Sequence, residues 1–260
     1  MSFIVRGMIS KSSFINSSAK TILKLNATRS FTTYMPTINF GKHYDAEIMP
    51  EKEAKPKAAM LLLHGIGDCG YYMLPYASWI ASEYRNTYFY APTGKTIPIS
   101  SRAKAEHIAW YDIPTTDIKG ANDCPGIGDS YNMIYNWVEE QIKKGIDPKH
   151  IVISGYSQGA ALALFSTLSL PYTIGKAIIF SGYLPMYDSI VASPEAKQSP
   201  IIMYHGSLDN KVPLEAAKQS AEIVKKLGCP IEFKSYVGIK HIIHRTMVED
   251  AIQQLKDVLY

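Results

Sequence analysis

Short runs of apolar and β-branched residues alternate with longer amphipathic segments from about Phe40 to the end of the chain. The short runs predict buried β-strands, and the longer segments, with apolar positions every three or four residues, predict helices. We expect strands at Asp45–Met49, Ala58–Leu63, Thr87–Ala91, Ile151–Ser154, Lys176–Ser181, Ile201–His205 and Ile231–Tyr236. We expect helices at Tyr72–Arg85, Asp129–Lys144, Gln158–Ser169, Leu214–Leu227 and Ile242–Leu259. This alternation predicts an α/β fold with a mostly parallel central sheet and helices on both faces.

The segment Pro92–Asp123 is rich in Pro, Thr, Ser and Gly and shows neither pattern. We expect an irregular loop there, with one short helix around Ala103–His107. Loops of this length in compact domains are usually functional or disordered. Because this one falls over the C-terminal edge of the predicted sheet, we expect part of it to wall a substrate site.

A serine stands between a predicted strand and a predicted helix. Ile151–Ser154 is followed by Gly155-Tyr156-Ser157-Gln158-Gly159 and then by an apolar helical segment. This G-x-S-x-G pattern is typical of a strained turn that exposes a serine hydroxyl at the edge of a sheet, with glycines that let strand and helix approach closely. We therefore predict that Ser157 is a nucleophile rather than an ordinary turn residue.

A serine nucleophile needs a histidine to accept its proton and a carboxylate to orient that histidine. In this type of fold, the carboxylate and then the histidine follow later strands. Asp209 is the carboxylate in the turn-rich segment after the strand Ile201–His205, whereas Asp188 follows an earlier strand. We favour Asp209 as the acid, and its alternative role is to cap the following helix.

Two histidines follow the last predicted strand, Ile231–Tyr236. His241 lies closer to the strand end, and His244 is expected inside the final helix. We favour His241 as the base, with His244 as the alternative.

Negative charge on an acyl oxygen is stabilised by backbone N–H donors. The predicted strand Ala58–Leu63 runs into His64-Gly65-Ile66-Gly67-Asp68, upstream of the nucleophile, where this fold supplies one such donor. The residue after the nucleophile supplies the other. We predict an oxyanion hole formed by the backbone N–H groups of Ile66 and Gln158.

Residues 1–34 differ in composition from the rest of the chain. They contain seven serines and no acidic residue, and their basic residues are Arg6, Lys11, Lys20, Lys24 and Arg29. This composition is typical of a mitochondrial transit peptide, with a mature start near Thr32 or Tyr34. The alternative is a disordered Ser-rich tail. We therefore divide the chain into a targeting peptide or N-terminal extension, residues 1–34, and a hydrolase domain, residues 35–260, and expect a mitochondrial protein of the matrix or inner-membrane surface.

The net charge of +4 comes from the N-terminal segment, because without its five cations 22 basic residues face 23 acidic ones. The charge therefore gives no support to a nucleic-acid partner. No apolar run approaches the roughly 18 to 20 residues of a membrane-spanning helix, so we expect a soluble protein without a transmembrane segment. Three widely spaced cysteines argue against a disulfide framework or a zinc site, and no metal is expected.

Several spaced motifs, taken together, closely resemble the acyl-protein thioesterase and small carboxylesterase family. They are Leu63-His64-Gly65-Ile66-Gly67-Asp68, Trp110-Tyr111-Asp112, Gly155-Tyr156-Ser157-Gln158-Gly159, His205-Gly206-x-x-Asp209-x-x-Val212-Pro213 and Gly238-x-x-His241. The resemblance implies a compact α/β-hydrolase without a cofactor, with Trp110 as a substrate-binding residue. It implies hydrolysis of acylated proteins, lysophospholipids or small esters. Two positions depart from the family pattern: Ser207 replaces a common acidic residue, and Ile242 replaces the serine after the histidine.

Two other functions remain open. A hydrolase fold can serve as an accessory subunit of a mitochondrial protein complex, with the N-terminal segment as its tether. The same fold also carries peptidases and dienelactone-type hydrolases. The intact set of Ser157, Asp209 and His241 favours a serine esterase or thioesterase.

Overall fold

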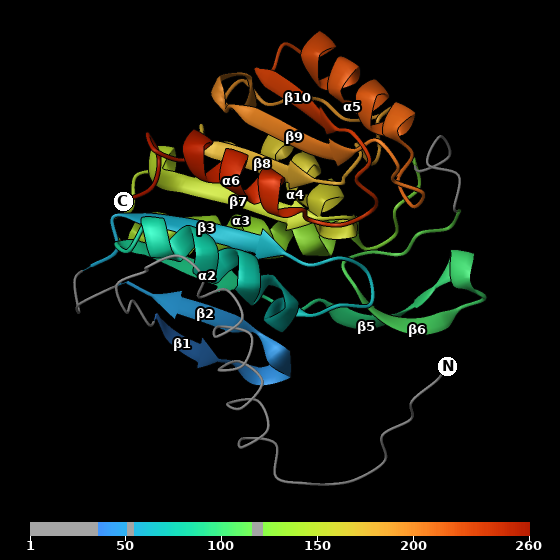
Figure 1. Ribbon diagram of the computed structural model, residues 1–260. Helices are drawn as coiled ribbons and strands as arrows, with labels where there is room; N and C mark the ends of the chain where they lie inside the picture. Colours follow the sequence, from blue (N-terminus) through green and yellow to red (C-terminus); the bar gives the residue numbers. More distant parts are fainter. Residues whose placement is uncertain (1–35, 51–54, 116–121) are drawn as a thin grey trace, which may run out of the picture. The chain divides into compact units, whose positions relative to one another are not determined.

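The computed structural model describes residues 36–50, 55–115 and 122–260, so the predicted targeting segment lies outside the described residues. Within them, an eight-stranded sheet has the order β1-β2-β4-β3-β7-β8-β9-β10 (Figure 1). The strands are β1 (Thr37–Phe40), β2 (Ala46–Met49), β3 (Ala58–Leu63), β4 (Thr87–Ala91), β7 (Ile151–Tyr156), β8 (Lys176–Phe180), β9 (Ile201–Gly206) and β10 (Ile231–Tyr236). The pairs β1–β2 and β2–β4 are antiparallel, and the other pairs are parallel. The predicted mostly parallel sheet is confirmed.

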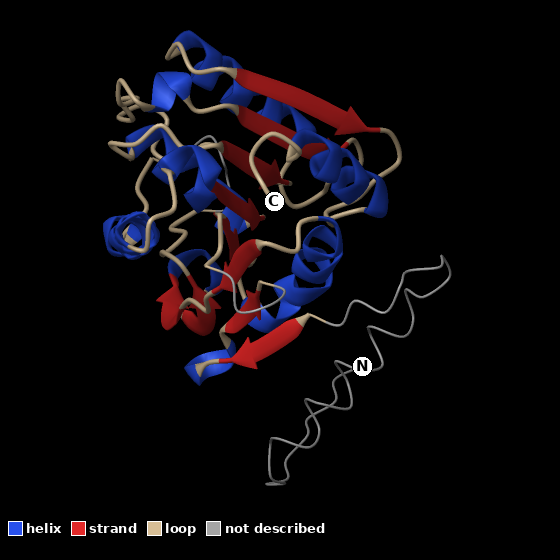
Figure 2. Cartoon of the chain, turned by 90° about the vertical axis from the view of Figure 1, so that its left-hand side faces the viewer, coloured by secondary structure: helices blue, strands red, loops and turns tan. Residues whose placement is uncertain are grey.

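Helices cover both faces of this sheet (Figure 2). One face carries α3 (Ile127–Lys143), α4 (Gln158–Ser169) and α5 (Leu214–Lys226), whose apolar residues share one buried core with β3, β7, β8 and β9. The other carries α2 (Leu74–Glu83) and α6 (Arg245–Gln254), which contact each other in front of the sheet in Figure 1. The central strand β3 is apolar throughout and fully buried because both faces of the sheet are covered there.

The segment after β4 corrects one prediction. The expected short helix at Ala103–His107 is wrong: β5 (Lys95–Ile99) and β6 (Ala105–Ala109) form an antiparallel hairpin apart from the main sheet. Ala103 and Lys104 reverse the chain with φ values of 53° and 57°. Cross-strand pairing along the whole of β5 outweighs the helix propensity of the Ala- and Lys-containing segment.

Two further elements, the final helix and the first strand, also differ from expectation. The final helix begins at Arg245 rather than Ile242, and His244 is its N-cap residue rather than an interior residue. The short strand β1 was not predicted, because its four residues alternate without a continuous apolar run. In the described part of the chain, no helix combines the length and apolar character needed to cross a bilayer.

The contact between α4 and the strands depends on two glycines. A Cβ atom on Gly159 would lie 2.3 Å from the Leu63 carbonyl oxygen, and one on Gly155 would lie 2.4 Å from the Gly159 carbonyl oxygen. Both neighbours are main-chain atoms, which have little room to move. Only glycine therefore allows helix α4 to begin directly against the ends of β3 and β7.

We expect Gly159→Ala to lower the free energy of unfolding by about 2 kcal/mol or more, because the methyl group overlaps main-chain atoms. Gly128→Ala is the matched control, since a Cβ there meets no atom within 4 Å and the position is helical. This control should be neutral or stabilising by up to about 1 kcal/mol. Urea unfolding followed by circular dichroism measures both, and equal effects of the two substitutions would contradict the packing argument.

Candidate active site

Ser157 occupies the sharp turn between β7 and α4. Its backbone has φ 56° and ψ −117°, a conformation that non-glycine residues rarely adopt. The turn is held by a hydrogen bond from the Ser157 N–H to the Phe180 carbonyl, 3.0 Å long. Such strain persists only where the surrounding structure fixes it, and here it lifts the serine to the C-terminal edge of the sheet.

The side chains of Ser157, His241 and Asp209 form a continuous chain of hydrogen bonds. His241 Nε2 lies 2.9 Å from Ser157 Oγ, and His241 Nδ1 lies 2.7 Å from Asp209 Oδ2. The three residues follow β7, β10 and β9, whose carboxyl ends meet at one edge because these strands are parallel. The structure therefore brings together the three residues that the sequence singled out.

Asp209 is fixed as an ionised acceptor. Burial opposes its ionisation, but the hydrogen bond from His241 and those from the backbone N–H groups of Lys211 and Val212, both 2.9 Å, hold its pKa below the usual value. The carboxylate therefore keeps its charge and its orientation toward the His241 ring.

A second histidine, near the end of β9, also contacts Asp209. His205 is fully buried, and its Nε2 lies 2.8 Å from the Val212 carbonyl and 3.3 Å from Asp209 Oδ2. Burial lowers the pKa of His205, so its ring is neutral and adds a donor beside Asp209 without adding a charge. The spacing in His205-Gly206-x-x-Asp209 could have revealed this contact, because a tight turn after the strand brings Asp209 back beside His205.

The loop after β3 is organised around His64. This side chain is fully buried, accepts a 2.9 Å hydrogen bond from the Gly94 N–H at Nε2, and donates from Nδ1 to the Gly65 carbonyl at 2.7 Å. Burial lowers the pKa of His64 to about 4, which keeps the ring neutral in this tautomer. Ile66 and Gln158 line the same cavity as Ser157. Gln158 is the first residue of α4, so its N–H has no acceptor within the helix.

Trp110 lies behind this loop. Its Nε1 donates a 2.8 Å hydrogen bond to the His64 carbonyl, and its ring lies 4.6 Å from the His64 ring between centroids. The Gln158 side chain fixes the same segment, accepting from the Trp110 N–H at 3.2 Å and donating to the Tyr111 carbonyl at 2.7 Å. Trp110 is buried and is not among the described residues that line the cavity, so a direct substrate contact stays a prediction.

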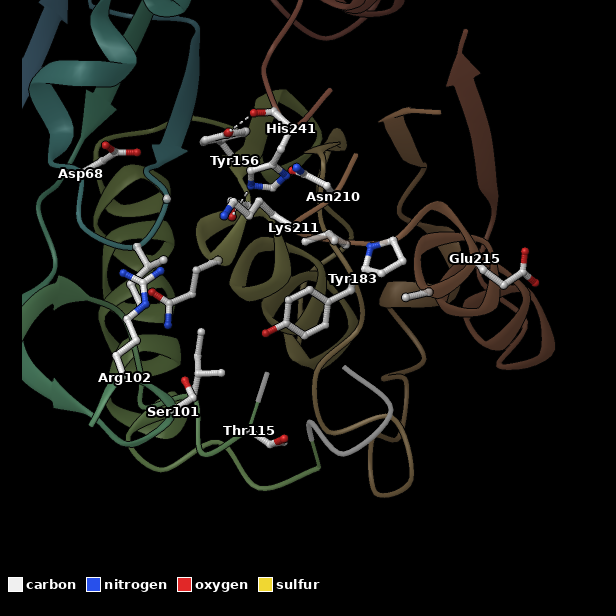
Figure 3. A pocket seen from close by; sticks show the side chains of 18 of the residues that line it. Asp68, Ser101, Arg102, Thr115, Tyr156, Tyr183, Asn210, Lys211, Glu215 and His241 are labelled. Carbon is white, nitrogen blue, oxygen red and sulfur yellow. Dashed lines mark hydrogen bonds between the residues drawn. The ribbon is translucent and has the colours of Figure 1, made fainter. Parts of the chain in front are cut away.

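A cavity of about 840 Å³ opens beside Ser157 (Figure 3). One part of its lining is apolar, formed by Ile113, Tyr183, Val212, Pro213 and Ala216. Charged side chains at its edge are Asp68, Arg102, Lys211 and Glu215. Ser101, Arg102 and Ile113 come from the segment Pro92–Asp123, which therefore contributes to the wall of the cavity as predicted.

The alternative acid and base are engaged elsewhere. His244 Nδ1 lies 2.9 Å from Thr246 Oγ1 at the start of α6. Asp188 is hydrogen-bonded to Asn122. Across the described ranges, no group of three potential metal ligands is close enough together to hold an ion.

The fold and the site define a class. A mostly parallel sheet covered by helices on both faces, with a serine on a strand–turn–helix connection and its histidine and aspartate on later loops, is the arrangement of an α/β-hydrolase.

Comparison with known proteins narrows this class to a family. A family model described as phospholipase/carboxylesterase matches residues 44–259. A probable carboxylesterase of Oryza sativa subsp. japonica is 33% identical over 202 residues, covering 76% of this chain and 76% of that protein. Acyl-protein thioesterase 1 of Kluyveromyces lactis is 30% identical over 217 residues, covering 80% and 95%. The crystal structure of Arabidopsis thaliana SOBER1 has a TM-score of 0.70 at 27% identity, covering 76% of this chain and 97% of that one. The chain belongs to the phospholipase/carboxylesterase family, and is an esterase or thioesterase.

The buried His64 makes stability depend on pH. Its pKa of about 4 in the folded protein is below the ordinary value of 6.5, so the unfolded chain binds more protons between these values and stability falls as the pH is lowered through this window. From pH 7.5 to 4.5 this one group should cost about 2 to 3 kcal/mol. We expect His64→Gln to be less stable than the wild type at pH 7.5 but to lose less stability on acidification, as measured by urea unfolding at both pH values. A variant with the wild-type pH dependence would contradict this role.

Proposed function

We propose that the chain is a serine hydrolase in which Ser157, His241 and Asp209 act as a catalytic triad. The observation that supports this proposal is the chain of hydrogen bonds from Asp209 through His241 to Ser157 at the rim of a cavity. A histidine that contacts both an ionised carboxylate and a serine hydroxyl can accept the serine proton and stabilise the resulting cation.

The reaction then follows from the positions of these groups. Ser157 Oγ attacks the acyl carbonyl while its proton passes to His241 Nε2, and Asp209 stabilises the imidazolium. The backbone N–H groups of Ile66 and Gln158 hold the oxyanion. His241 returns the proton to the leaving thiol or alcohol. Water, deprotonated by His241, then attacks the acyl-enzyme, and the carboxylic acid leaves as Ser157 regains its proton.

We propose acylated proteins as the substrates, with lysophospholipids and small esters as the other members of the same chemical class. Acyl-protein thioesterase 1 of Kluyveromyces lactis is a relative over 80% of the chain. The apolar part of the cavity lining, which includes Ile113, Tyr183 and Val212, suits a hydrocarbon acyl chain. The alternatives of an accessory subunit, a peptidase and a dienelactone-type hydrolase gain no support from the relatives described above, whose names are those of carboxylesterases and a thioesterase.

We expect a fluorophosphonate probe to label the wild-type protein covalently and not to label Ser157→Ala, because only an activated serine reacts with it. His241→Ala should lose labelling by at least about 10³-fold in rate, since the serine then lacks its base. Labelling is followed by gel fluorescence on protein whose circular dichroism spectrum is native. Equal labelling of wild type and Ser157→Ala would overturn the proposed nucleophile.

The same preparations distinguish the substrate classes. Matched acyl thioesters, oxygen esters and anilides of one chain length should be hydrolysed at measurable rates in the first two cases only. Rapid hydrolysis of the anilides alone would favour the peptidase alternative.

We propose further that residues 1–34 direct the protein to mitochondria. The support for this proposal is the composition of the segment, which carries five basic residues and no acidic residue. A fusion of residues 1–34 to a fluorescent protein should colocalise with a mitochondrial dye. A matched fusion with Gln at Arg6, Lys11, Lys20, Lys24 and Arg29 should stay diffuse, and a diffuse signal from the unaltered fusion would contradict the proposal.

A further inference from the structure

His241 lies on a connection without regular structure. β10 ends at Tyr236 and α6 begins at Arg245, so the residues between them form a loop. Two hydrogen bonds tie the first part of this loop to the connection after β9: Gly238 N–H to Ser207 Oγ, 2.9 Å, and Leu208 N–H to the Ile239 carbonyl, 2.8 Å. Both anchors precede His241. A general base works only within hydrogen-bond reach of its partners, so whatever holds the main chain at His241 itself bears on its alignment with Ser157 and Asp209.

Tyr156 supplies that anchor. Its hydroxyl donates a 2.8 Å hydrogen bond to the main-chain carbonyl of His241, drawn as a dashed line in Figure 3. Its ring also lies against the imidazole, with 5.0 Å between the ring centroids and 36° between their planes. One side chain therefore contacts both the backbone and the ring of His241.

The position of Tyr156 in the chain gives these contacts their effect. It is the last residue of β7 and directly precedes Ser157. β7 pairs with β3 on one side and β8 on the other, so it lies in the interior of the sheet. The hydrogen bond of the Tyr156 hydroxyl thus ties the main chain of His241 to the residue next to Ser157. This link constrains the distance between His241 and Ser157.

Two further features preserve this link. Burial raises the pKa of Tyr156, and the charges of Asp209 and Asp68 raise it further, so the hydroxyl stays protonated and remains a donor at neutral pH. Glycine at position 65 leaves room for the ring: a Cβ there would lie 3.1 Å from Tyr156 Cδ1, a tight contact. The loop after β3 therefore leaves space for the tyrosine.

We propose that Tyr156 is a positioning residue for the reaction: its hydroxyl holds the backbone of His241 so that the imidazole stays aligned between Ser157 and Asp209. This inference rests on the proposed catalytic roles of Ser157 and His241. Tyr156 acts through His241 and does not take part in bond making or breaking.

The test is Tyr156→Phe, which keeps the ring and removes only the hydroxyl. Losing one partly buried hydrogen bond that aligns a base should lower kcat about tenfold with KM within about twofold of wild type, measured on a short-chain ester. The rate of fluorophosphonate labelling should fall by a similar factor. The thermal midpoint should stay within a few degrees of wild type. Tyr88→Phe is the matched control, because it removes a hydroxyl bonded at 2.7 Å to Glu47 on β2, away from the site, and should keep wild-type kcat.

Each outcome decides one question. If wild-type protein is labelled, Ser157→Ala is not, and Tyr156→Phe keeps kcat within about twofold of wild type, the proposed function stands and the positioning role is overturned. A higher KM at unchanged kcat would make the hydroxyl a substrate contact and would also overturn the positioning role. A fall in kcat that is matched by a large fall in the thermal midpoint would overturn it as well, because the loss would then come from unfolding. If wild-type protein is not labelled at all, the proposed function itself fails.

Discussion

The close approach of helix α4 to the ends of β3 and β7 is the constraint on which the site depends. At Gly155 and Gly159 the main chains are so near that no side chain fits between them. This approach forces Ser157 into its strained turn and places the first N–H of α4 beside the loop after β3. The proposed nucleophile and both proposed oxyanion donors are thus fixed by one packing contact. A methyl group at Gly155 or Gly159 would push helix α4 away from the strands and move these groups apart.

Around this contact, buried polar side chains hold the loops of the site in place while remaining uncharged. His64 is held neutral by burial and connects the loop after β3 to Gly94. Trp110 donates to the His64 carbonyl in this loop, and the Gln158 side chain in turn holds the main chain of Trp110 and Tyr111. His205 is likewise neutral beside Asp209. Buried charges are costly unless they are paired. Because His64 and His205 are neutral, neither competes with His241 for the negative charge of Asp209.

The cavity lining combines apolar and charged side chains from several connections. Tyr183 comes from the connection after β8, and Val212 and Lys211 come from the connection after β9. Asp68 comes from the loop after β3 and Arg102 from the turn between β5 and β6. Parallel strands that end at one edge of the sheet are what gather these segments around one cavity.

The sequence by itself determined the main sheet except for β1, most of the helices, and the order of Ser157, Asp209 and His241. These features depend on local periodicity and on short turns with fixed glycines, which are visible along the chain. The hairpin of β5 and β6 was not determined in this way, because its strands gain stability only by pairing with each other, and the local propensity at Ala103–His107 favours a helix. Tertiary structure alone decided the contact of Tyr156 with His241. These two residues lie on segments far apart in the chain, and only the parallel arrangement of β7, β8, β9 and β10 brings them within bonding distance.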